Sequence, residues 1–505
     1  MNTSLDNSST KKERIAVLIA LAVAAFLATL FNSCLSPMFS IVGCLDQCCF
    51  ARAGQAICAG MVPYLDFIDV KGPLLFLLYG AGYALTPNST TGIWLIETFS
   101  LFFSLYFMYR LARLFIPSRG AACCAAVLCL FYILQRELYA DGGRAEMFTG
   151  CAFACVLWQS ARLCVVHDWR REYRKFAFVM GMAFSFCFFI KHNAIVPPAA
   201  ALGLSALAFL FRREWKAFAR LAIFGVLGCA VVAAPVLTYM VSVGNVMGFY
   251  EVMFKLNPVP SVALNVVNAV FYGGKLLQDP CTTFVLVSLP CLWLNPWKQL
   301  SVLKRAGLLL IALLAFGSAF MGLYSYYLLY CTPLVIISAV VLVNHLRITA
   351  RPVCLLACAV YLTLFCIRSN PAWHYKNHFR VTQELVPSLQ AMDDEVSAHP
   401  GSSIIYLGCL DAGFGLGRGL LPGCPEWIGL NGAPASYVQK QLEAVNARKA
   451  DYVVITKDAA QSYGRFLEQN GYREVLRTNE EETSSLYYYT TRKPMSCILY
   501  SKDQL

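Results

Sequence analysis

Charged side chains that lie directly beside long apolar runs are the first feature of this sequence that could do chemistry. A charge at the border of a hydrocarbon layer is costly to maintain, so it usually has a use. Lysine ammonium groups bind phosphate, and a neighbouring carboxylate can take a proton from a hydroxyl group. This mixture suits a reaction on a phosphate-bearing lipid. The charged residues that directly abut apolar segments are Asp46, Asp69, Lys71, Glu146 and Lys191.

Other polar residues of these regions have a more ordinary interpretation. His192 follows an apolar run, where a histidine more often caps a helix or anchors it at the interface. The tyrosine-rich run at 324–327 is typical of an interfacial aromatic belt, and the alternative is a tyrosine that faces the substrate. Simple charges of solvated loops, on this interpretation, are Arg52, Arg136, Glu137 and Asp141.

The composition predicts a polytopic membrane protein. The chain has 505 residues, of which 58% are hydrophobic and 14% charged, whereas a soluble domain has about 25% charged residues. The net charge of +12 is divided among short clusters between apolar runs. This pattern is typical of topology signals, and we therefore expect no nucleic-acid partner. The 22 cysteines form no CxxC pairs, which argues against a zinc site.

The basic clusters also predict how the chain crosses the membrane. The run at 73–85 has about 13 residues, fewer than the roughly 20 that a span requires. If it lies along the outer surface instead, every later basic cluster falls on the cytoplasmic side, together with the N-terminus. About eleven transmembrane helices result. They are expected at 15–35, 92–109, 121–135, 147–166, 176–190, 194–211, 222–243, 281–297, 306–322, 327–343 and 353–367.

The chain divides by composition into a membrane domain, 1–369, and a more polar C-terminal domain, 370–505. Short β-like runs alternate with helical stretches in the second part, which predicts a soluble α/β domain on the extracytoplasmic side. The strands are expected at 403–407, 452–456 and 497–500, and the helices at 435–448 and 459–470. Within the membrane domain, the outer loop at 244–280 is a candidate lid, with irregular structure at its Asn-Pro-Val-Pro segment, 257–260.

The order of these motifs resembles a known family. An acidic residue, Asp46, follows the first helix, and a Gly-x-x-x-Tyr-x-Asp-x-x-Asp-x-Lys-Gly-Pro segment occupies 60–73. A glutamate in Arg-Ala-Glu-Met and a lysine in Phe-Ile-Lys-His come later, at Glu146 and Lys191. Over roughly residues 10–345 the chain resembles the GT-C superfamily of membrane glycosyltransferases, in the branch of the lipid A aminoarabinose transferase and the protein O-mannosyltransferases. The resemblance implies a helical GT-C-like membrane domain with juxtamembrane helices on its outer surface.

The resemblance also implies an activity, namely inverting transfer of a sugar from a polyprenyl-phosphate donor to an acceptor at the outer face. The acceptor would be a glycan, a lipid or a protein. By this analogy Asp46 is the catalytic base and Glu146 assists the site or contributes to a metal position. Asp46 is followed by Gln47 rather than by a second acid, so a divalent metal stays an open question, and no other cofactor is implied. The predicted substrate-binding residues are Tyr64, Asp66, Asp69, Lys71, Arg144, Lys191 and His192.

Two other functions compete with this one. A transporter or flippase of lipid-linked saccharides would place ionisable residues and broken helices near the bilayer midplane. Here the charges gather at one surface, which favours an enzyme at the interface. A non-catalytic assembly partner that presents its C-terminal domain would not need Asp46, Lys71, Glu146 and Lys191 together.

Overall fold

The computed structural model describes most of the chain, in two compact units. Unit 1 comprises 1–33, 96–236 and 260–372, and unit 2 comprises 34–95, 237–259 and 373–505. The described residues are 3–33, 35–38, 45–87, 89–139, 142–166, 169–256, 280–319, 325–346, 387–407, 426–427, 435–477 and 497–502.

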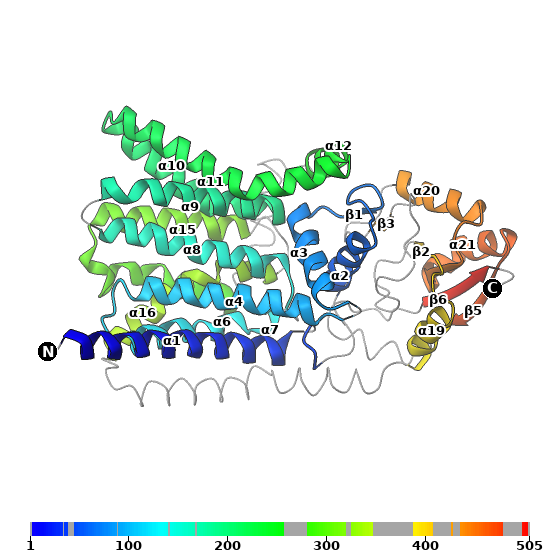
Figure 1. The fold of residues 1–505 in the computed structure, drawn as a ribbon, viewed down its shortest axis with the longest axis horizontal. Helices are drawn as coiled ribbons and strands as arrows, with labels where there is room; N and C mark the ends of the chain where they lie inside the picture. Colours follow the sequence, from blue (N-terminus) through cyan, green and yellow to red (C-terminus); the bar gives the residue numbers. More distant parts are fainter. Residues whose placement is uncertain are drawn as a thin grey trace. The chain divides into compact units, whose positions relative to one another are not determined.

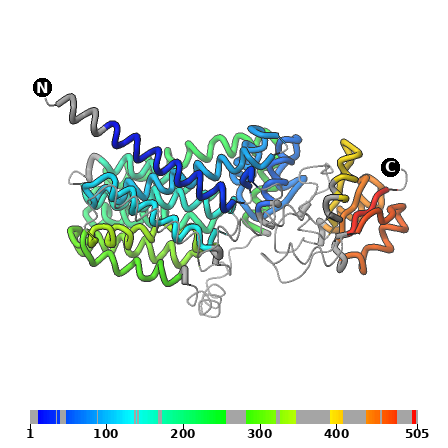
Figure 2. The backbone as a smooth tube through the Cα atoms, turned by 90° about the horizontal axis from the view of Figure 1, so that it is seen from below, coloured from blue at the N-terminus to red at the C-terminus, as the bar shows by residue number. Residues whose placement is uncertain are grey.

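Unit 1 is a bundle of long helices that run side by side (Figures 1 and 2). Its interior contains one large cluster of buried apolar side chains, drawn from most of these helices, and a smaller cluster of Tyr173, Ala177, Phe209 and Leu221. The helices are α1 (Thr3–Asn32), α4 (Thr91–Ala112), α5 (Arg119–Leu128), α6 (Leu130–Ile133), α7 (Arg136–Tyr139), α8 (Ala145–Val165), α9 (Trp169–Ile190), η1 (His192–Ile195), α10 (Val196–Phe211), α11 (Trp215–Ser242), α14 (Pro280–Ser288), η3 (Pro290–Trp293), η4 (Trp297–Gln299), α15 (Val302–Ala319), η5 (Ser325–Val335) and α16 (Ile336–His345).

Eight helices of the described residues are long and apolar enough to cross a membrane, which makes this a multi-pass membrane protein. They correspond to eight of the predicted spans. The predicted spans at 121–135 and 281–297 are shorter apolar helices, Arg119–Ile133 and Thr282–Trp293. The predicted span at 353–367 lies outside the described residues.

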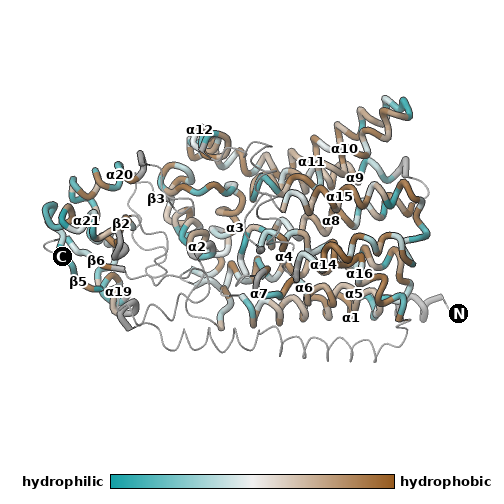
Figure 3. Tube along the Cα trace, turned by 180° about the vertical axis from the view of Figure 1, so that it is seen from behind, coloured by the Kyte–Doolittle hydropathy of each residue, from teal (hydrophilic) through white to brown (hydrophobic). Residues whose placement is uncertain are grey.

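Polar contacts join helix ends at one end of the unit 1 bundle. Arg119 at the start of α5 lies 3.5 Å from Glu13 of α1, and Arg162 of α8 pairs with Glu172 of α9 at 2.8 Å. Lys304 of α15 donates to a backbone carbonyl near the end of α8 at 2.5 Å. In Figure 3 the helix tips at this end of the bundle, on the side of the N-terminus, are coloured as hydrophilic. The basic residues of these three contacts therefore lie at one end of the bundle, and the assignment of this end to the cytoplasm stays a prediction.

Helices α9 and α11 approach each other closely through glycines. A Cβ atom on Gly228 would lie 1.9 Å from the carbonyl oxygen of Phe178, and one on Gly181 would lie 2.0 Å from that of Gly225. No side chain fits at such distances. In a membrane, lipid removes the hydrophobic driving force between helices, so helices associate through van der Waals packing. Small residues at the contact allow the backbones to approach closely enough for this packing.

The N-terminal part of unit 2 contains two packed helices and the loop between them. Helix α2 (Leu45–Cys58) ends before Gly60, whose positive φ of +83° ends the helix without steric cost. Helix α3 (Pro73–Leu85) begins with a proline, which has no N–H to leave unpaired in a first turn. The apolar run at 73–85 is thus a helix of 13 residues, and its place on the outer surface stays a prediction. Unit 2 also contains α12 (Val246–Tyr250), η2 (Glu251–Leu256) and β1 (Phe67–Ile68). The rest of the candidate lid, 257–279, lies outside the described residues.

The C-terminal part of unit 2 contains a small mixed sheet. Its order is β2-β4-β6-β5, with β2 and β4 parallel and the other pairs antiparallel. A separate strand, β3 (Glu426–Trp427), pairs in parallel with β1. The strands of the sheet are β2 (Ile404–Leu407), β4 (Tyr452–Thr456), β5 (Tyr472–Arg477) and β6 (Cys497–Lys502), and the helices are α19 (Pro387–Ala398), α20 (Ala435–Asn446) and α21 (Lys457–Gln469).

These elements confirm the predicted α/β character of the C-terminal part. The three predicted strands and two predicted helices are present, while α19 and β5 were not predicted. The predicted domain boundary between 369 and 370 lies outside the described residues and stays a prediction.

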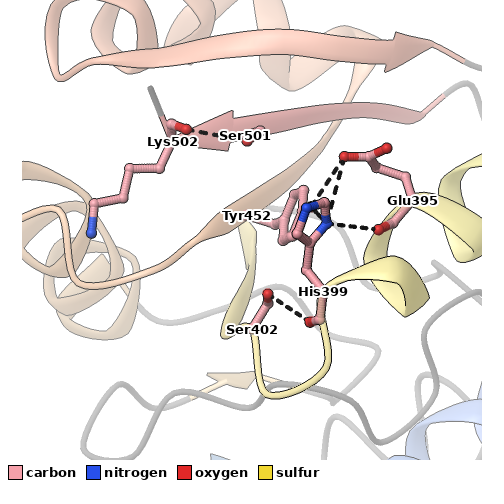
Figure 4. Close-up of polar contacts among 6 residues, drawn as sticks. All are labelled: Glu395, His399, Ser402, Tyr452, Ser501 and Lys502. Carbon is pink, nitrogen blue, oxygen red and sulfur yellow. Dashed lines mark hydrogen bonds and ion pairs between the residues drawn. The ribbon is translucent and has the colours of Figure 1, made fainter. Parts of the chain in front are cut away.

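A polar contact holds α19 against the sheet (Figure 4). The hydroxyl group of Tyr452 in β4 donates to Glu395 at 3.1 Å and lies 2.9 Å from Nδ1 of His399. The hydroxyl group of Ser402 donates to the carbonyl of His399 at 2.8 Å and fixes the turn after the helix. Burial, with the Glu395 carboxylate beside it, raises the pKa of Tyr452 well above its ordinary value. The tyrosine therefore stays neutral and can donate.

Candidate functional site

Glu146 and Lys191 form a buried ion pair in unit 1. The Lys191 ammonium group donates to Oε1 of Glu146. Lys191 is 7% exposed and Glu146 is 3% exposed. Glu146 lies in the first turn of α8, where the helix dipole favours a negative charge. Lys191 follows the last residue of α9 and precedes η1. The packing of α8 against α9 therefore brings together two residues that are 45 positions apart.

Two stacked tyrosines carry cations over their rings beside this pair. Tyr326 and Tyr327 follow Ser325, the first residue of η5, with their ring centroids 5.0 Å apart and their planes at 21°. The Arg144 guanidinium group lies 3.9 Å above the ring of Tyr326, and the Lys191 ammonium group lies 3.5 Å from the ring centre of Tyr327. The α8 cluster, as we name it, comprises Arg144, Glu146, Lys191, Tyr326 and Tyr327.

The charges of the α8 cluster favour an anionic ligand. Two cations, Arg144 and Lys191, lie in this cluster in surroundings of low dielectric constant. Arg144 and Lys191 are both more than nine-tenths buried, and charge interactions are stronger there than in water. The aromatic rings hold the cations without neutralising them. The arrangement can therefore stabilise negative charge that develops on a phosphate group.

A second buried carboxylate, Glu97, supports the segment that leads into this cluster. Its Oε2 accepts from the hydroxyl group of Ser33 at 2.6 Å, and its Oε1 accepts from the hydroxyl group of Tyr139 at 2.6 Å and the N–H of Gly143 at 2.9 Å. Glu97 is fully buried in α4. Our sequence analysis did not identify it, although an acidic residue inside an apolar run was a usable signal.

The predicted phosphate ligand Lys71 belongs to a different group of residues, in unit 2. Its ammonium group lies 3.6 Å from Oδ1 of Asp69, which is buried, and 5.6 Å from the ring centre of Phe50. The hydroxyl group of Tyr64 donates to the carbonyl of Lys71 at 2.7 Å. The structure thus brings together the Tyr64, Asp69 and Lys71 of the predicted motif.

Tyr64 and Asp66 have contacts that shape this loop. Tyr64 has a positive φ of +62°, which a residue with a side chain seldom adopts, and its N–H donates to the carbonyl of Phe67 at 2.7 Å. Burial, and then the nearby Asp69, raise the pKa of Tyr64, so its hydroxyl group remains a donor. Oδ2 of Asp66 accepts from the N–H of Val62 at 2.8 Å. The predicted roles of Tyr64 and Asp66 in substrate binding stay predictions.

The remaining predicted residues are placed only in part. Asp46 is in the first turn of α2, and its side chain is outside what the structure describes. His192 is half-buried as the first residue of η1. The side chains of Arg136 and Glu137, and Asp141 as a whole, are also outside the described part.

The described residues do not fit a divalent metal ion. Among them, no group of three or more histidine, cysteine, aspartate or glutamate side chains could hold one. The Glu146 carboxylate contacts the ammonium group of Lys191 rather than a cluster of other ligands. We therefore derive no step through a metal.

Solved structures of similar fold are known. The crystal structure of ArnT from Cupriavidus metallidurans in the apo state matches with a TM-score of 0.58 at 15% identity, over 97% of this chain and 98% of that chain. The same protein bound to undecaprenyl phosphate matches with a TM-score of 0.55 at 13% identity, over 96% and 97%. This chain has the ArnT fold. The predicted fold class is confirmed as a helical membrane protein of ArnT-like fold with a C-terminal α/β part.

Other comparisons add little. The archaeal oligosaccharyltransferase AglB from Archaeoglobus fulgidus, in complex with an inhibitory peptide and a dolichol-phosphate, matches with a TM-score of 0.45 at 13% identity, over 94% of this chain and 74% of that chain. We base no conclusion on this weaker similarity. No protein-family model matches the chain, and no curated protein sequence matches it significantly.

Proposed function

We propose that this protein transfers a sugar from a polyprenyl-phosphate donor to an acceptor at the outer face of the membrane. The observation that carries the proposal is the α8 cluster, in which the buried cations of Lys191 and Arg144 lie over two tyrosine rings, with Lys191 in contact with Glu146. The ArnT fold supports it, since ArnT was solved with undecaprenyl phosphate bound. The residues named for the site, the outer location and the division into domains 1–369 and 370–505 belong to this proposal.

The reaction that the cluster suits is a displacement at the anomeric carbon. The acceptor hydroxyl oxygen attacks this carbon, the bond from the carbon to the phosphate oxygen breaks, and its electron pair leaves on the polyprenyl phosphate. Lys191 and Arg144 stabilise the charge that develops on that phosphate. The hydroxyl proton moves to a carboxylate, and the sequence resemblance assigns this base to Asp46. The role of Lys71 as a second phosphate ligand likewise rests on the sequence motif.

The alternative, a transporter or flippase of lipid-linked saccharides, predicts a different arrangement. A transporter requires a substrate site near the bilayer midplane that opens to each side in turn. In unit 1, the α8 cluster lies at the start of α8 and the end of α9 rather than midway along them. This position favours chemistry at an interface.

Binding of undecaprenyl phosphate to the purified full-length protein tests the proposal. We expect Lys191→Ala to weaken binding by about ten- to a hundredfold, because a charge-assisted contact contributes about 1.5–3 kcal/mol. Lys304→Ala is the matched control, since this exposed lysine lies at the other end of the bundle. Equal affinity in both variants, or no binding by the unmodified protein, would refute the proposal.

The reaction itself is tested in cells that produce the protein. Asp46→Asn and Lys191→Ala should each remove one sugar from the envelope glycans seen by mass spectrometry, in cells where the amount of protein in the membrane is confirmed to match that of the unmodified protein. If every sugar survives both substitutions, the transferase interpretation is wrong. If proteoliposomes move the intact lipid-linked saccharide across the bilayer without cleaving it, the transporter is the correct function.

A further inference from the structure

We propose that Glu97 is a positioning residue that holds the start of α8 in place and thereby sets the Glu146–Lys191 ion pair. The inference rests on the proposed function only for the catalytic importance of that pair. The geometric part concerns Glu97 and the segment before α8, and it can be tested without any substrate.

The Glu97 carboxylate joins three segments that are distant in sequence. Ser33 follows the last residue of α1, Tyr139 ends α7, and Gly143 lies in the connection to α8. Figure 1 shows α1, α4 and α7 as neighbours in the bundle. All three donors are neutral, and the accepting group is fully buried. Losing this acceptor would break all three hydrogen bonds at once.

The connection before α8 is built around this carboxylate. Gly142 and Gly143 have positive φ angles of +80° and +61°. A Cβ atom on Gly142 would lie 2.5 Å from Oε1 of Glu97 and 2.8 Å from Oγ of Ser33, so only glycine fits there. The backbone therefore runs directly against the Glu97 side chain, and its course depends on that side chain.

The residues that follow this connection are those of the α8 cluster. Arg144 is the N-cap residue of α8, in an extended conformation with φ −79° and ψ 155°. It comes directly after Gly143, whose N–H is bound to Glu97. Glu146 follows in the first turn and contacts Lys191. A shift of the connection would therefore move both Arg144 and Glu146 relative to Lys191.

Because all three donors to Glu97 are neutral, a neutral acceptor at position 97 should hold the connection before α8 equally well. In Glu97→Gln, the amide oxygen can still accept from Tyr139 and Gly143, and the amide N–H can donate to Ser33. We expect this variant to keep the connection in place. Glu97→Ala removes all three hydrogen bonds and should release it. A catalytic role of the Glu97 charge predicts the opposite, namely that the glutamine variant fails as badly as the alanine variant.

The test measures the reactivity of the Lys191 amine in the full-length protein in detergent. Lysines are acetylated with acetic anhydride over a range of pH, and the extent is read by mass spectrometry with exposed Lys304 as the internal reference. Glu97→Ala should raise acetylation of Lys191 about tenfold, the equivalent of losing one hydrogen bond of about 1.4 kcal/mol. Glu97→Gln should stay within about twofold of the unmodified protein, well below the tenfold change of a lost hydrogen bond.

Single-donor variants keep the test decisive if Glu97→Ala does not fold. Ser33→Ala and Tyr139→Phe each remove one donor and should raise Lys191 acetylation by a smaller amount. Ser288→Ala is the control, since it removes a hydroxyl group that lies 3.0 Å from that of Ser338, elsewhere in unit 1. Unchanged Lys191 acetylation in the folded variants would overturn the inference, as would a glutamine variant that matches alanine.

Binding of undecaprenyl phosphate is measured on the same preparations. If the unmodified protein does not bind it, the proposed function fails while the acetylation data still decide the role of Glu97. If the unmodified protein binds it and the variants of Glu97 leave Lys191 acetylation unchanged, the proposed function survives and the positioning role is wrong.

Discussion

A double-mutant cycle on the Glu146–Lys191 pair would measure how strongly the two charges interact. The variants are Glu146→Met, Lys191→Met and the two combined, since methionine fills a similar volume without charge. Coulomb's law at contact distance and an effective dielectric constant of about 20 gives an attraction of about 4 kcal/mol. Each single variant leaves one charge buried without its partner, and should lower the free energy of unfolding by about 3–5 kcal/mol.

The double variant should lose far less than the sum of the two single variants, because it leaves neither of the paired charges behind. We expect a coupling energy of about 2–4 kcal/mol. Unfolding by SDS titration in mixed micelles, followed by circular dichroism, supplies the free energies.

The Arg162–Glu172 pair is the matched control for this cycle. Its charges are 2.8 Å apart, but the side chains are 23% and 32% exposed. Water and salt screen such a pair, so its coupling energy should be about 0.2–1 kcal/mol and should fall as salt is added. Equal coupling in the two cycles would refute our account of the α8 cluster as a desolvated site.

Three further predictions concern contacts inside one unit or the other. Gly228→Ala should lower the melting temperature and the yield of folded protein, because the new Cβ atom would lie 1.9 Å from a backbone oxygen of α9. A Cβ atom on Gly203 would meet nothing within 4 Å, so the control variant Gly203→Ala should be neutral or stabilising by up to about 1 kcal/mol. Tyr64→Phe should reduce stability by about 0.5–1.5 kcal/mol in the same SDS titration, because it removes the 2.7 Å bond to the carbonyl of Lys71. Burial raises the pKa of Tyr472 to about 12. The contribution of Tyr472 to stability is therefore complete below pH 10 and is lost as the pH rises to about 12. Hydrogen exchange of the β5 amides should accelerate over that pH interval, and it should accelerate less in Tyr472→Phe.

The features that the sequence predicted best have strong local causes. Helix α3 begins and ends at the predicted residues because Pro73 can only start a helix and the apolar run stops at Leu85. Strands β2, β4 and β6 are buried apolar runs, and these are recognisable without knowledge of their partners. By contrast, β5 alternates poorly and is largely exposed, so its strand character comes from pairing with β6.

Residues of the site were predictable only where the neighbouring sequence forms a recognisable motif. Glu146 and Lys191 were identified through their order and their place beside apolar runs, and the structure adds that they touch. Glu97 has no such motif, and its three partners lie between 42 and 64 residues away in the chain. The placing of Arg144 and Lys191 over successive tyrosines likewise depends on the packing of η5 against α8, which no local pattern encodes.

The hydrogen bonds of Glu97 have a consequence for how the chain is inserted during synthesis. A carboxylate in a membrane-crossing segment lowers the tendency of that segment to leave the translocon, by roughly 2.5–3.5 kcal/mol at the middle of a helix and less toward its ends. Ser33 is already synthesised when α4 emerges from the ribosome, but Tyr139 and Gly143 are made 42 and 46 residues after Glu97. Helix α4 therefore lies in the bilayer, or beside the translocon, before Glu97 has all of its hydrogen bonds. Those from Tyr139 and Gly143 form only after the start of α8 has been synthesised. Ribosome arrest at successive lengths between these residues should capture the delay.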